Sequence, residues 1–270
     1  GLVDHDNTHW PEAVFESAWS NFMLSNLNDT LGQILTLRSG FFKDDQYIPE
    51  ATVLRALTYF NLCEYETVEK ILLDFEDDYR PQQAEMSEFA SQYSSAEGRK
   101  LADQAWDTYF DKATKKDTVL PKSFFAKVLR NRDLAGIVRH LELMKQEEEI
   151  ISKQKDRWQD AMGPYLAKVI EADRQRYKRR AGVLLLREMA RQSNKIADLL
   201  TQSEIIRFEV VDAQRVDYAY KASNVDVGSA DSRMDLDFAT AVDFIYWPFN
   251  GEFWKDELGY YSYTEQGSCN

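Results

Sequence analysis

The sequence is short of the residues that break helices and build loops. Its 270 residues include only 11 Gly and 6 Pro, so few long irregular connections are expected. Long stretches consist instead of Ala, Leu, Glu, Lys, Arg and Gln, whose side chains lose little conformational entropy in a helix. Because 44% of the residues are hydrophobic, a chain of this length can bury a substantial core. We therefore predict a mostly α-helical protein.

Cysteines are also few, and long apolar runs and an excess of positive charge are missing. Cys63 and Cys269 lack the spacing of zinc ligands, and the sequence leaves open whether they are separate thiols or one long-range disulfide. No apolar run approaches the roughly 20 residues of a membrane helix, and no signal peptide is recognisable. A formal net charge of −13 repels nucleic acid unless a local basic patch prevails, so protein partners fit this composition better.

Two segments near the start of the chain share one pattern. PEAVFESAWSNFMLSNLNDTLGQILTL, at 11–37, aligns with PEATVLRALTYFNLCEYETVEKILLDF, at 49–75, at a constant offset of 38 residues (49 − 11). Each segment opens with Pro, which suits the first turn of a helix, and continues with apolar residues at helical spacing. Each then breaks near a polar residue, Asn28 or Glu66, and resumes as a second amphipathic helix. This predicts two helix–turn–helix repeats that stack on each other, because one unit alone does not bury its apolar face.

These repeats, at about 11–81, resemble tetratricopeptide repeats of the type found in bacterial envelope assembly proteins. The second repeat shows the pattern best, in Ala56, Tyr59, Phe60, Leu62, Tyr65, Ile71, Leu72, Phe75, Tyr79 and Pro81. Two features depart from the family. Ser25 or Cys63 replaces the Gly of the inter-helix turn, and the repeat is longer than the family's usual 34 residues or so. The ending WPFNGEFWKDELGYY, together with the Pro-Glu-Ala opening of the repeats, also resembles uncharacterised repeat proteins of predatory and gliding bacteria.

The tetratricopeptide resemblance implies a non-enzymatic adaptor or scaffold, a subunit of a bacterial envelope or periplasmic assembly. Such solenoids bind other proteins on the inner face built by the first helix of each repeat. The residues that this implies for partner binding are Asn21, Asn28, Arg55, Tyr59 and Asn61. The expected location, the periplasm or the cell envelope, rests on the resemblance and on the absence of an initiator Met. Any membrane contact is expected to be indirect, and no nucleic acid or cofactor is expected.

A long region with one Pro and little Gly, residues 123–222, follows the repeats and a short connector. Apolar residues at 137–162 and at 189–213 advance by three, four or seven positions, which is typical of a coiled-coil seam. Gly163-Pro164 interrupts these stripes, and folding the chain back there places Glu147–Glu149 opposite residues 177–179 of the basic run 174–180. This predicts an antiparallel coiled-coil hairpin. The alternative is one kinked helix whose charged faces are solvated.

The end of the chain is rich in aromatic residues. YWPFNGEFWKDELGYYSY, at 246–263, follows an irregular stretch of Gly, Ser and Asp. We expect this tail either to lie as a strap across the helices or to present rings to a partner, and both roles are compatible. The rings expected to meet a partner are Trp247, Phe249, Phe253 and Trp254.

Other chemistry is only weakly indicated. An alternative function is binding or hydrolysis of a cell-wall glycan by the tail, whose carboxylates are Glu252, Asp256 and Glu257, although nothing fixes the pair that a glycosidase needs. DHDNTH at 4–9 contains plausible metal ligands but belongs to the N-terminal tail. The basic run 174–180 is a candidate for phosphate contacts, yet its acidic counterpart lies in the same chain. No Gly-rich phosphate loop, nucleophile motif or zinc motif occurs, so we predict no catalytic residue and no metal site.

The complete prediction is an all-α protein with four parts. These are an N-terminal tail at 1–10, tetratricopeptide-like repeats at 11–117, a long antiparallel coiled-coil hairpin at 118–222 and an irregular aromatic-rich segment at 223–270.

Overall fold

The computed structural model describes residues 3–4, 6–7, 9–42, 46–93, 98–110, 117–154, 162–223, 251–261, 263 and 267. Its elements in chain order are α1 (Trp10–Met23), α2 (Leu27–Leu37), α3 (Glu50–Asn61), α4 (Tyr65–Tyr93), α5 (Gly98–Tyr109), α6 (Lys122–Leu129), α7 (Arg132–Ser152), α9 (Gly163–Ser223) and the 3-10 turn η2 (Lys255–Glu257). No strand occurs in these parts of the chain, so the prediction of an all-α protein is confirmed.

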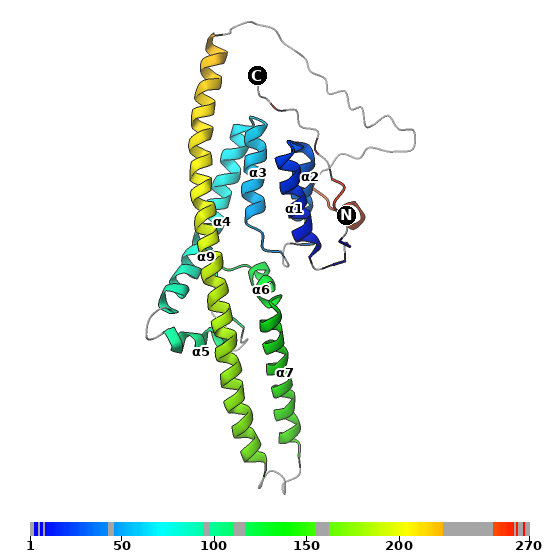
Figure 1. Cartoon of the computed structure of the whole chain (residues 1–270), viewed down its shortest axis with the longest axis vertical. Helices are drawn as coiled ribbons and strands as arrows, with labels where there is room; N and C mark the ends of the chain where they lie inside the picture. Colours follow the sequence, from blue (N-terminus) through cyan, green and yellow to red (C-terminus); the bar gives the residue numbers. More distant parts are fainter. Residues whose placement is uncertain are drawn as a thin grey trace.

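The 61-residue helix α9 forms the long axis of the molecule. Figure 1 shows α1 to α4 beside its upper part, α5 beside its middle, and α6 and α7 along its lower part. Leu185, Met189 and Ile196 of α9 are fully buried, and their spacing of four and then seven residues places them on one face of the helix. They share a core with Phe75 of α4 and Phe124 of α6. The segments predicted at 11–117 and 118–222 therefore share one core.

The turns that join α1 to α2 and α3 to α4 have the same geometry, 38 residues apart. Ser25 has φ 62° and Cys63 has φ 59°. In each turn, the N–H of the following residue donates to a carbonyl five residues back, at 2.9 Å in the first turn and 3.0 Å in the second. This is the Schellman ending of a helix, in which Gly usually takes the left-handed position. The offset found in the sequence is thus also present in the backbone.

The helix α4 continues well beyond the repeat pattern. It runs through Pro81 to Tyr93, although Pro cannot donate the backbone hydrogen bond of a helix interior. The Gln82 side chain next to this Pro donates to the carbonyl of Asp78 at 2.8 Å and accepts from Oη of Tyr47 at 2.9 Å. Both the helix and its side-chain contacts therefore continue past the expected end of the second repeat.

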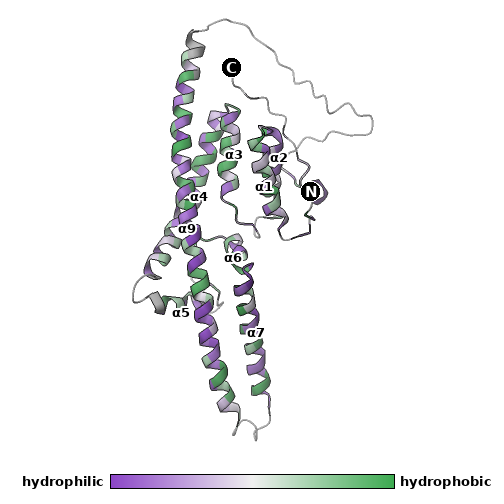
Figure 2. Cartoon of the chain, viewed as in Figure 1, coloured by the Kyte–Doolittle hydropathy of each residue, from purple (hydrophilic) through white to green (hydrophobic). Residues whose placement is uncertain are grey.

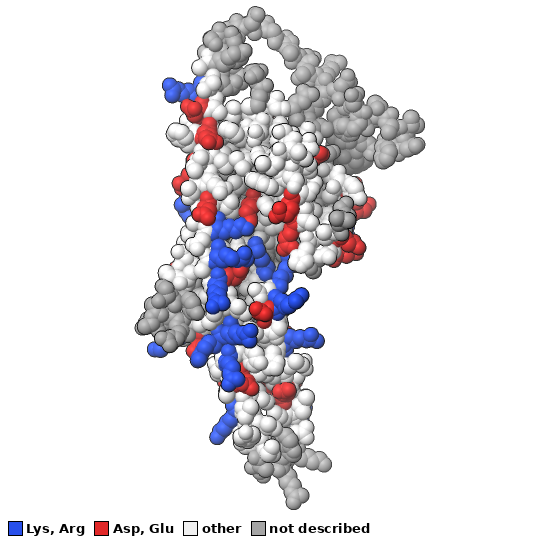
Figure 3. Space-filling view, viewed as in Figure 1, with Lys and Arg blue, Asp and Glu red and all other residues white. Residues whose placement is uncertain are grey.

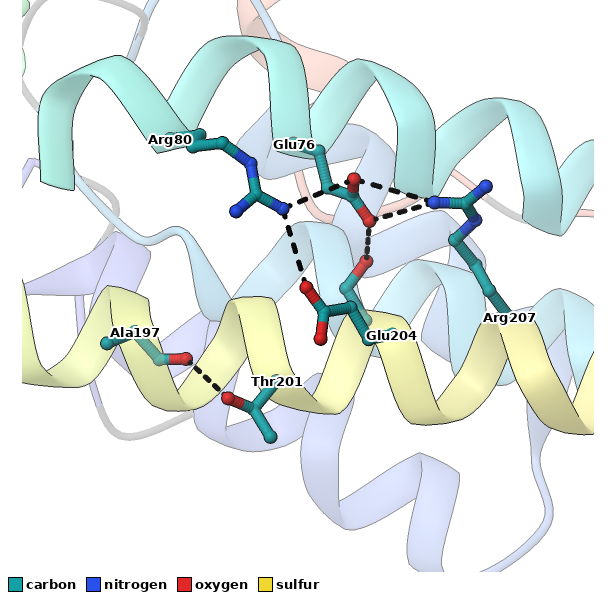
Figure 4. Close-up of polar contacts among 7 residues, drawn as sticks. Glu76, Arg80, Ala197, Thr201, Glu204 and Arg207 are labelled. Atoms are coloured by element: carbon teal, nitrogen blue, oxygen red, sulfur yellow. Dashed lines mark hydrogen bonds and ion pairs between the residues drawn. The ribbon is translucent and has the colours of Figure 1, made fainter. Parts of the chain in front are cut away.

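A polar network joins α4 to α9 (Figure 4). The side chain of Glu76 is only 14% exposed and accepts hydrogen bonds from Ser203 at 3.2 Å and from Arg207 at 3.3 Å. Nη2 of Arg80 lies 3.5 Å from a carboxylate oxygen of Glu76 and 3.5 Å from one of Glu204. These contacts fix the upper part of α9 against α4.

The helix α7 and the lower part of α9 lie side by side and run in opposite directions (Figure 1). We call this pair the arm. Glu148 of α7 forms an ion pair with Arg174 of α9, one helical turn before the residues 177–179 that were predicted to face it. Gly163 and Pro164 are the first residues of α9, where Pro is well tolerated, so the chain reverses before them. The upper part of α9 packs on α3 and α4 instead of continuing the arm.

Candidate functional site

The residues predicted to face a partner on the repeats lie on three helices. They are Asn21 in α1, Asn28 in α2, and Arg55, Tyr59 and Asn61 in α3. The prediction placed all of them on the first helices of the repeats. This was wrong for Asn28, because the left-handed turn ends α1 at Met23 and leaves Asn28 on a second helix.

These five side chains differ in what they offer to a partner. Tyr59 is only 5% exposed, and the guanidinium of Arg55 lies 5.6 Å from the centre of its ring, within the range of a cation–π contact. Asn61 is exposed, and its amide donates to the carbonyl of Leu57 in its own helix. Oδ1 of Asn28 is buried and has no hydrogen-bond partner in the described part of the chain. Asn61 is thus at the surface and Arg55 is half-buried over the Tyr59 ring, whereas Tyr59 belongs to the packing.

Positive charge gathers between α2 and α3. Arg38 is exposed as a whole residue, but partial burial of its guanidinium, and then the neighbouring Arg55, lower its pKa, while Tyr263, Tyr59 and Asp74 act in the opposite direction. Two guanidiniums therefore lie close enough to repel each other, with one carboxylate nearby. Tyr263 belongs to the C-terminal segment, so the end of the chain reaches this part of the repeats.

The described part of the C-terminal segment, residues 251–261, 263 and 267, packs on the repeats, and we call it the strap. Leu258 is 4% exposed and lies in a small core with Trp10 and Val14. The N–H of Gly259 donates to Oγ1 of Thr36 at 3.0 Å. Gly259 also has φ 91°, and a Cβ there would lie 3.2 Å from the Trp10 ring, so glycine suits this position both conformationally and sterically. The tail thus lies across the helices in the residues described.

The four aromatic residues predicted to meet a partner have different surroundings. Trp247 and Phe249 lie outside the described residues. Phe253 is half-buried and meets the ring of Tyr261 edge-on at 5.7 Å. Trp254 is 58% exposed, and its backbone N–H donates to Oη of Tyr261 at 3.1 Å. Among the described members, Phe253 therefore packs within the strap and Trp254 faces solvent.

The carboxylates of the tail and His9 at the start of the chain lie at the surface. Glu252, Asp256 and Glu257 are all exposed. Nδ1 of His9 lies 2.8 Å from a carboxylate oxygen of Glu12. Within the residues that the structure describes, no three His, Cys, Asp or Glu side chains are placed to hold a metal ion together.

Cys63, which was left open between a thiol and a disulfide, is disulfide-bonded. The only other cysteine in the sequence is Cys269, and it lies outside the described residues. The turn between α3 and α4 therefore carries a covalent cross-link.

A surface that the sequence did not single out lies on the upper part of α9. Its large apolar side chains are between 54% and 76% exposed, and they are Ile205, Phe208, Val211, Val216 and Tyr218. A cleft of about 260 Å³ lies beside Phe208 and Val211 and is bordered by Glu69 and Arg207. Ile206 and Val210, which belong to the seam pattern found at 189–213, are buried. The exposed apolar residues lie between those of the seam pattern in the sequence. The spacing of apolar residues alone does not show whether a helix face is covered by another helix or exposed.

A second exposed apolar surface lies at the free end of the arm. The exposed side chains there are Ile150, Met162, Tyr165 and Val169, with exposures between 41% and 64%. Figure 2 shows hydrophobic residues at the lower ends of both α7 and α9. A cleft of about 450 Å³ lies between the two helix ends and is lined by Ile151 and Pro164.

Comparison with known proteins adds no relative. No helix in the described regions is both long enough and apolar enough to cross a membrane. No protein-family model matches the chain, and neither curated proteins nor solved structures gave a match.

Proposed function

We propose that this protein is a non-enzymatic adaptor or scaffold that connects other proteins in a multi-subunit assembly. One observation carries the proposal: a single continuous helix, α9, joins two exposed apolar surfaces. Tyr165 belongs to the first surface and Phe208 to the second. With a rise of about 1.5 Å per residue, these two side chains lie roughly 65 Å apart along the helix. Exposed apolar surfaces that are this far apart fit two partners better than one active site.

The finer architecture that we propose is a pair of tetratricopeptide-like repeats followed by a coiled-coil arm. The matching turns at Ser25 and Cys63 support the repeats. The antiparallel packing of α7 on α9, with the Glu148–Arg174 ion pair, supports the arm. The exposed residues of the repeats, Asn61 among them, would form a further contact surface of the scaffold.

We also propose a location in the bacterial envelope or periplasm. The disulfide at Cys63 supports this location, because disulfides persist in oxidising compartments and are rare in a reducing cytosol. Mass spectrometry of the native protein, alkylated before and after reduction, would test it. A fully alkylated Cys63 in the unreduced sample would contradict the proposed location.

The adaptor role is tested by capture from native extract with the full chain and with surface variants. Phe208→Glu and Tyr165→Glu each place a charge on one apolar surface, and each is expected to lose its own subset of captured proteins. Gln202→Glu is the matched control, because Gln202 is exposed on the same helix and lies between the two surfaces in sequence. If all variants capture the same proteins as the unmodified chain, the two surfaces are not partner sites and the proposal fails.

Glycan binding remains the second candidate because the strap exposes two rings, Trp254 at 58% and Tyr260 at 78%. Aromatic faces of this kind stack on sugars. A cell-wall glycan array probed with the full chain and with Trp254→Ala distinguishes this function. Glycan binding that is lost in Trp254→Ala, together with unchanged protein capture in Phe208→Glu and Tyr165→Glu, would favour the second candidate over the adaptor.

A further inference from the structure

Four arginines form a stripe along the middle of α9. Arg176, Arg180, Arg187 and Arg191 follow each other at steps of four, seven and four residues. These steps place them within about 60° of one another around the helix. All four are exposed, and Figure 3 shows Lys and Arg side chains gathered over this part of the molecule. We call these four residues the arginine stripe.

The side of α9 that points away from the arginine stripe already holds two helices through carboxylates. Glu148 of α7 pairs with Arg174. Asp107 of α5 lies 2.7 Å from Nζ of Lys178, which is one helical turn further along the same face. Asp103, one helical turn earlier on α5, also forms an ion pair with α9. The chain therefore shows twice how a helix with acidic side chains is held against the basic side chains of α9.

The charge of the arginine stripe is only partly balanced within the chain. Arg180 and Arg187 form no ion pair with any residue in the described part of the chain. The two outer arginines have acidic partners only on α9 itself, three residues earlier, at 3.3 Å and 2.7 Å. Such exposed pairs within one helix are weak, so they compete little with a partner that brings further carboxylates.

A basic cleft continues the stripe at its upper end. It has a volume of about 240 Å³ and lies between α6, α7 and α9, where Lys127, Arg130 and Arg191 face it together with Glu188. Nζ of Lys127 donates to a backbone carbonyl at 2.9 Å. Burial lowers the pKa of Lys127, and the nearby arginines add to this effect while Glu188 opposes it. An anionic side chain would relieve part of the repulsion among these cations.

We infer that the arginine stripe binds an acidic α-helix of a partner protein, in the way that α5 and α7 are held on the opposite side of α9. The inference rests on the proposed adaptor role and names the chemistry of one of its partners. A partner helix with carboxylates at the same four-, seven- and four-residue steps places one opposite each arginine. Because this series of steps reads the same in both directions, the partner helix can run parallel or antiparallel to α9.

Two other kinds of polyanion fit the stripe less well. A membrane-surface helix needs apolar side chains to insert beside its basic ones, and no large apolar side chain of α9 between residues 170 and 204 is strongly exposed. Single-stranded nucleic acid is bound through exposed rings that alternate with cations, and no exposed ring lies along the stripe. The net charge of −13 opposes both, whereas a short acidic helix adds little repulsion at a distance.

The test uses the full chain and a designed helical peptide whose only charged side chains are four glutamates at the stripe spacing. Fluorescence anisotropy is expected to show binding that weakens as salt is added. The double variant Arg180→Glu, Arg187→Glu is expected to bind the peptide at least tenfold more weakly. The control Lys70→Glu, Lys145→Glu changes the net charge by the same amount at exposed positions on α4 and α7, and it should bind like the unmodified chain. Helical circular dichroism of each variant verifies that the fold is retained.

Several outcomes would overturn the inference. Equal binding by the stripe variant and the control would place the peptide elsewhere. Equal binding of a peptide with the same glutamates at scrambled spacing would remove the match to a helix. Binding of duplex DNA or of phosphatidylserine vesicles, without binding of the peptide, would assign the stripe to another polyanion.

Failure of the inference can be distinguished from failure of the proposed function. If the peptide does not bind but Phe208→Glu still loses captured proteins, the adaptor role stands and the stripe assignment falls. If the peptide binds as expected but no protein is captured from extract through either apolar surface, the stripe assignment stands and the adaptor role loses its support.

Discussion

The close approach of α5 to α9 depends on one glycine, and replacing it should separate the two helices. Gly182 lies inside α9 and is buried. A Cβ at this position would lie 1.9 Å from the carbonyl oxygen of Ala102 in α5 and 2.9 Å from its carbonyl carbon. Because backbone cannot rotate away as a long side chain does, Gly182→Ala forces one helix to move.

The size of the effect follows from two opposing contributions. To reach the shortest Cβ contact that proteins tolerate, α5 must move by at least 1.1 Å (3.0 − 1.9). That movement loosens Ala102, Ala105 and Tyr109, all of which are at most 4% exposed, and overpacking of this kind costs about 1–3 kcal/mol. Ala is better than Gly in a helix by about 1 kcal/mol. Since the clash is with backbone, we take the upper end of the cost and expect a net loss of about 2 kcal/mol.

A second glycine in a helix provides the matched control. Gly136 lies in α7, is exposed, and a Cβ there would meet no heavy atom within 4 Å. Gly136→Ala should therefore stabilise the protein by about 0.5–1 kcal/mol through helix propensity alone. Urea unfolding followed by helical circular dichroism compares the two variants. Adding Ala102→Gly to Gly182→Ala should not restore stability, because the clash is with the carbonyl oxygen. If Gly182→Ala stabilises the protein as much as Gly136→Ala does, α5 does not lie against α9 as described.

Three further predictions concern the network between α4 and α9, the strap and the partly buried Tyr79. Glu76→Ala should lower the free energy of unfolding by about 1–2 kcal/mol, because Ser203 and Arg207 lose their acceptor. The control Glu66→Ala, at an exposed position of the same helix, should change the free energy of unfolding by less than about 0.5 kcal/mol. Equal effects of the two variants in urea unfolding would contradict the network. Leu258→Ala removes the buried strap residue that packs on Trp10. Hydrogen exchange of the backbone amides should therefore accelerate at 253–261 and stay unchanged in the middle of α9. An equal increase of the exchange rate in both places would mean that the strap unfolds only together with the core. Burial raises the pKa of Tyr79 from 10.0 to about 12, with Asp78 adding to it, so the folded protein keeps a proton that the unfolded chain loses above pH 10. Stability should therefore fall between about pH 10 and 12, by at most about 1.4 kcal/mol per pH unit for this group, and a Tyr79→Phe variant with an unchanged alkaline slope would refute this origin.

The helices and the repeat were predictable from the sequence because both depend on local patterns. Helical spacing of apolar residues, Pro at the start of each repeat, and the offset between Pro11 and Pro49 involve residues that are near one another in the chain or related by a constant shift. The turn positions were also visible, since Ser25 and Cys63 stand where the left-handed residue of each turn lies. Such features do not depend on which helices meet in space.

Only the tertiary structure decided which helix faces meet. The basic run of α9 contains several cations of similar local pattern, yet Arg174 turns to α7, Lys178 turns to α5, and Arg180 remains at the surface. Rotation by about 100° per residue places Arg180 well away from Arg174 and Lys178, which lie within about 40° of each other. Long-range burial of the shared core then decides which of these directions are covered, and the positions of α5 and α7 decide which carboxylate each covered cation meets. By itself, the sequence determined an all-helical chain with a duplicated helix pair near its start. The arginine stripe and the two exposed apolar surfaces were decided by packing, because an uncovered helix face has the same local spacing of residues as a covered one.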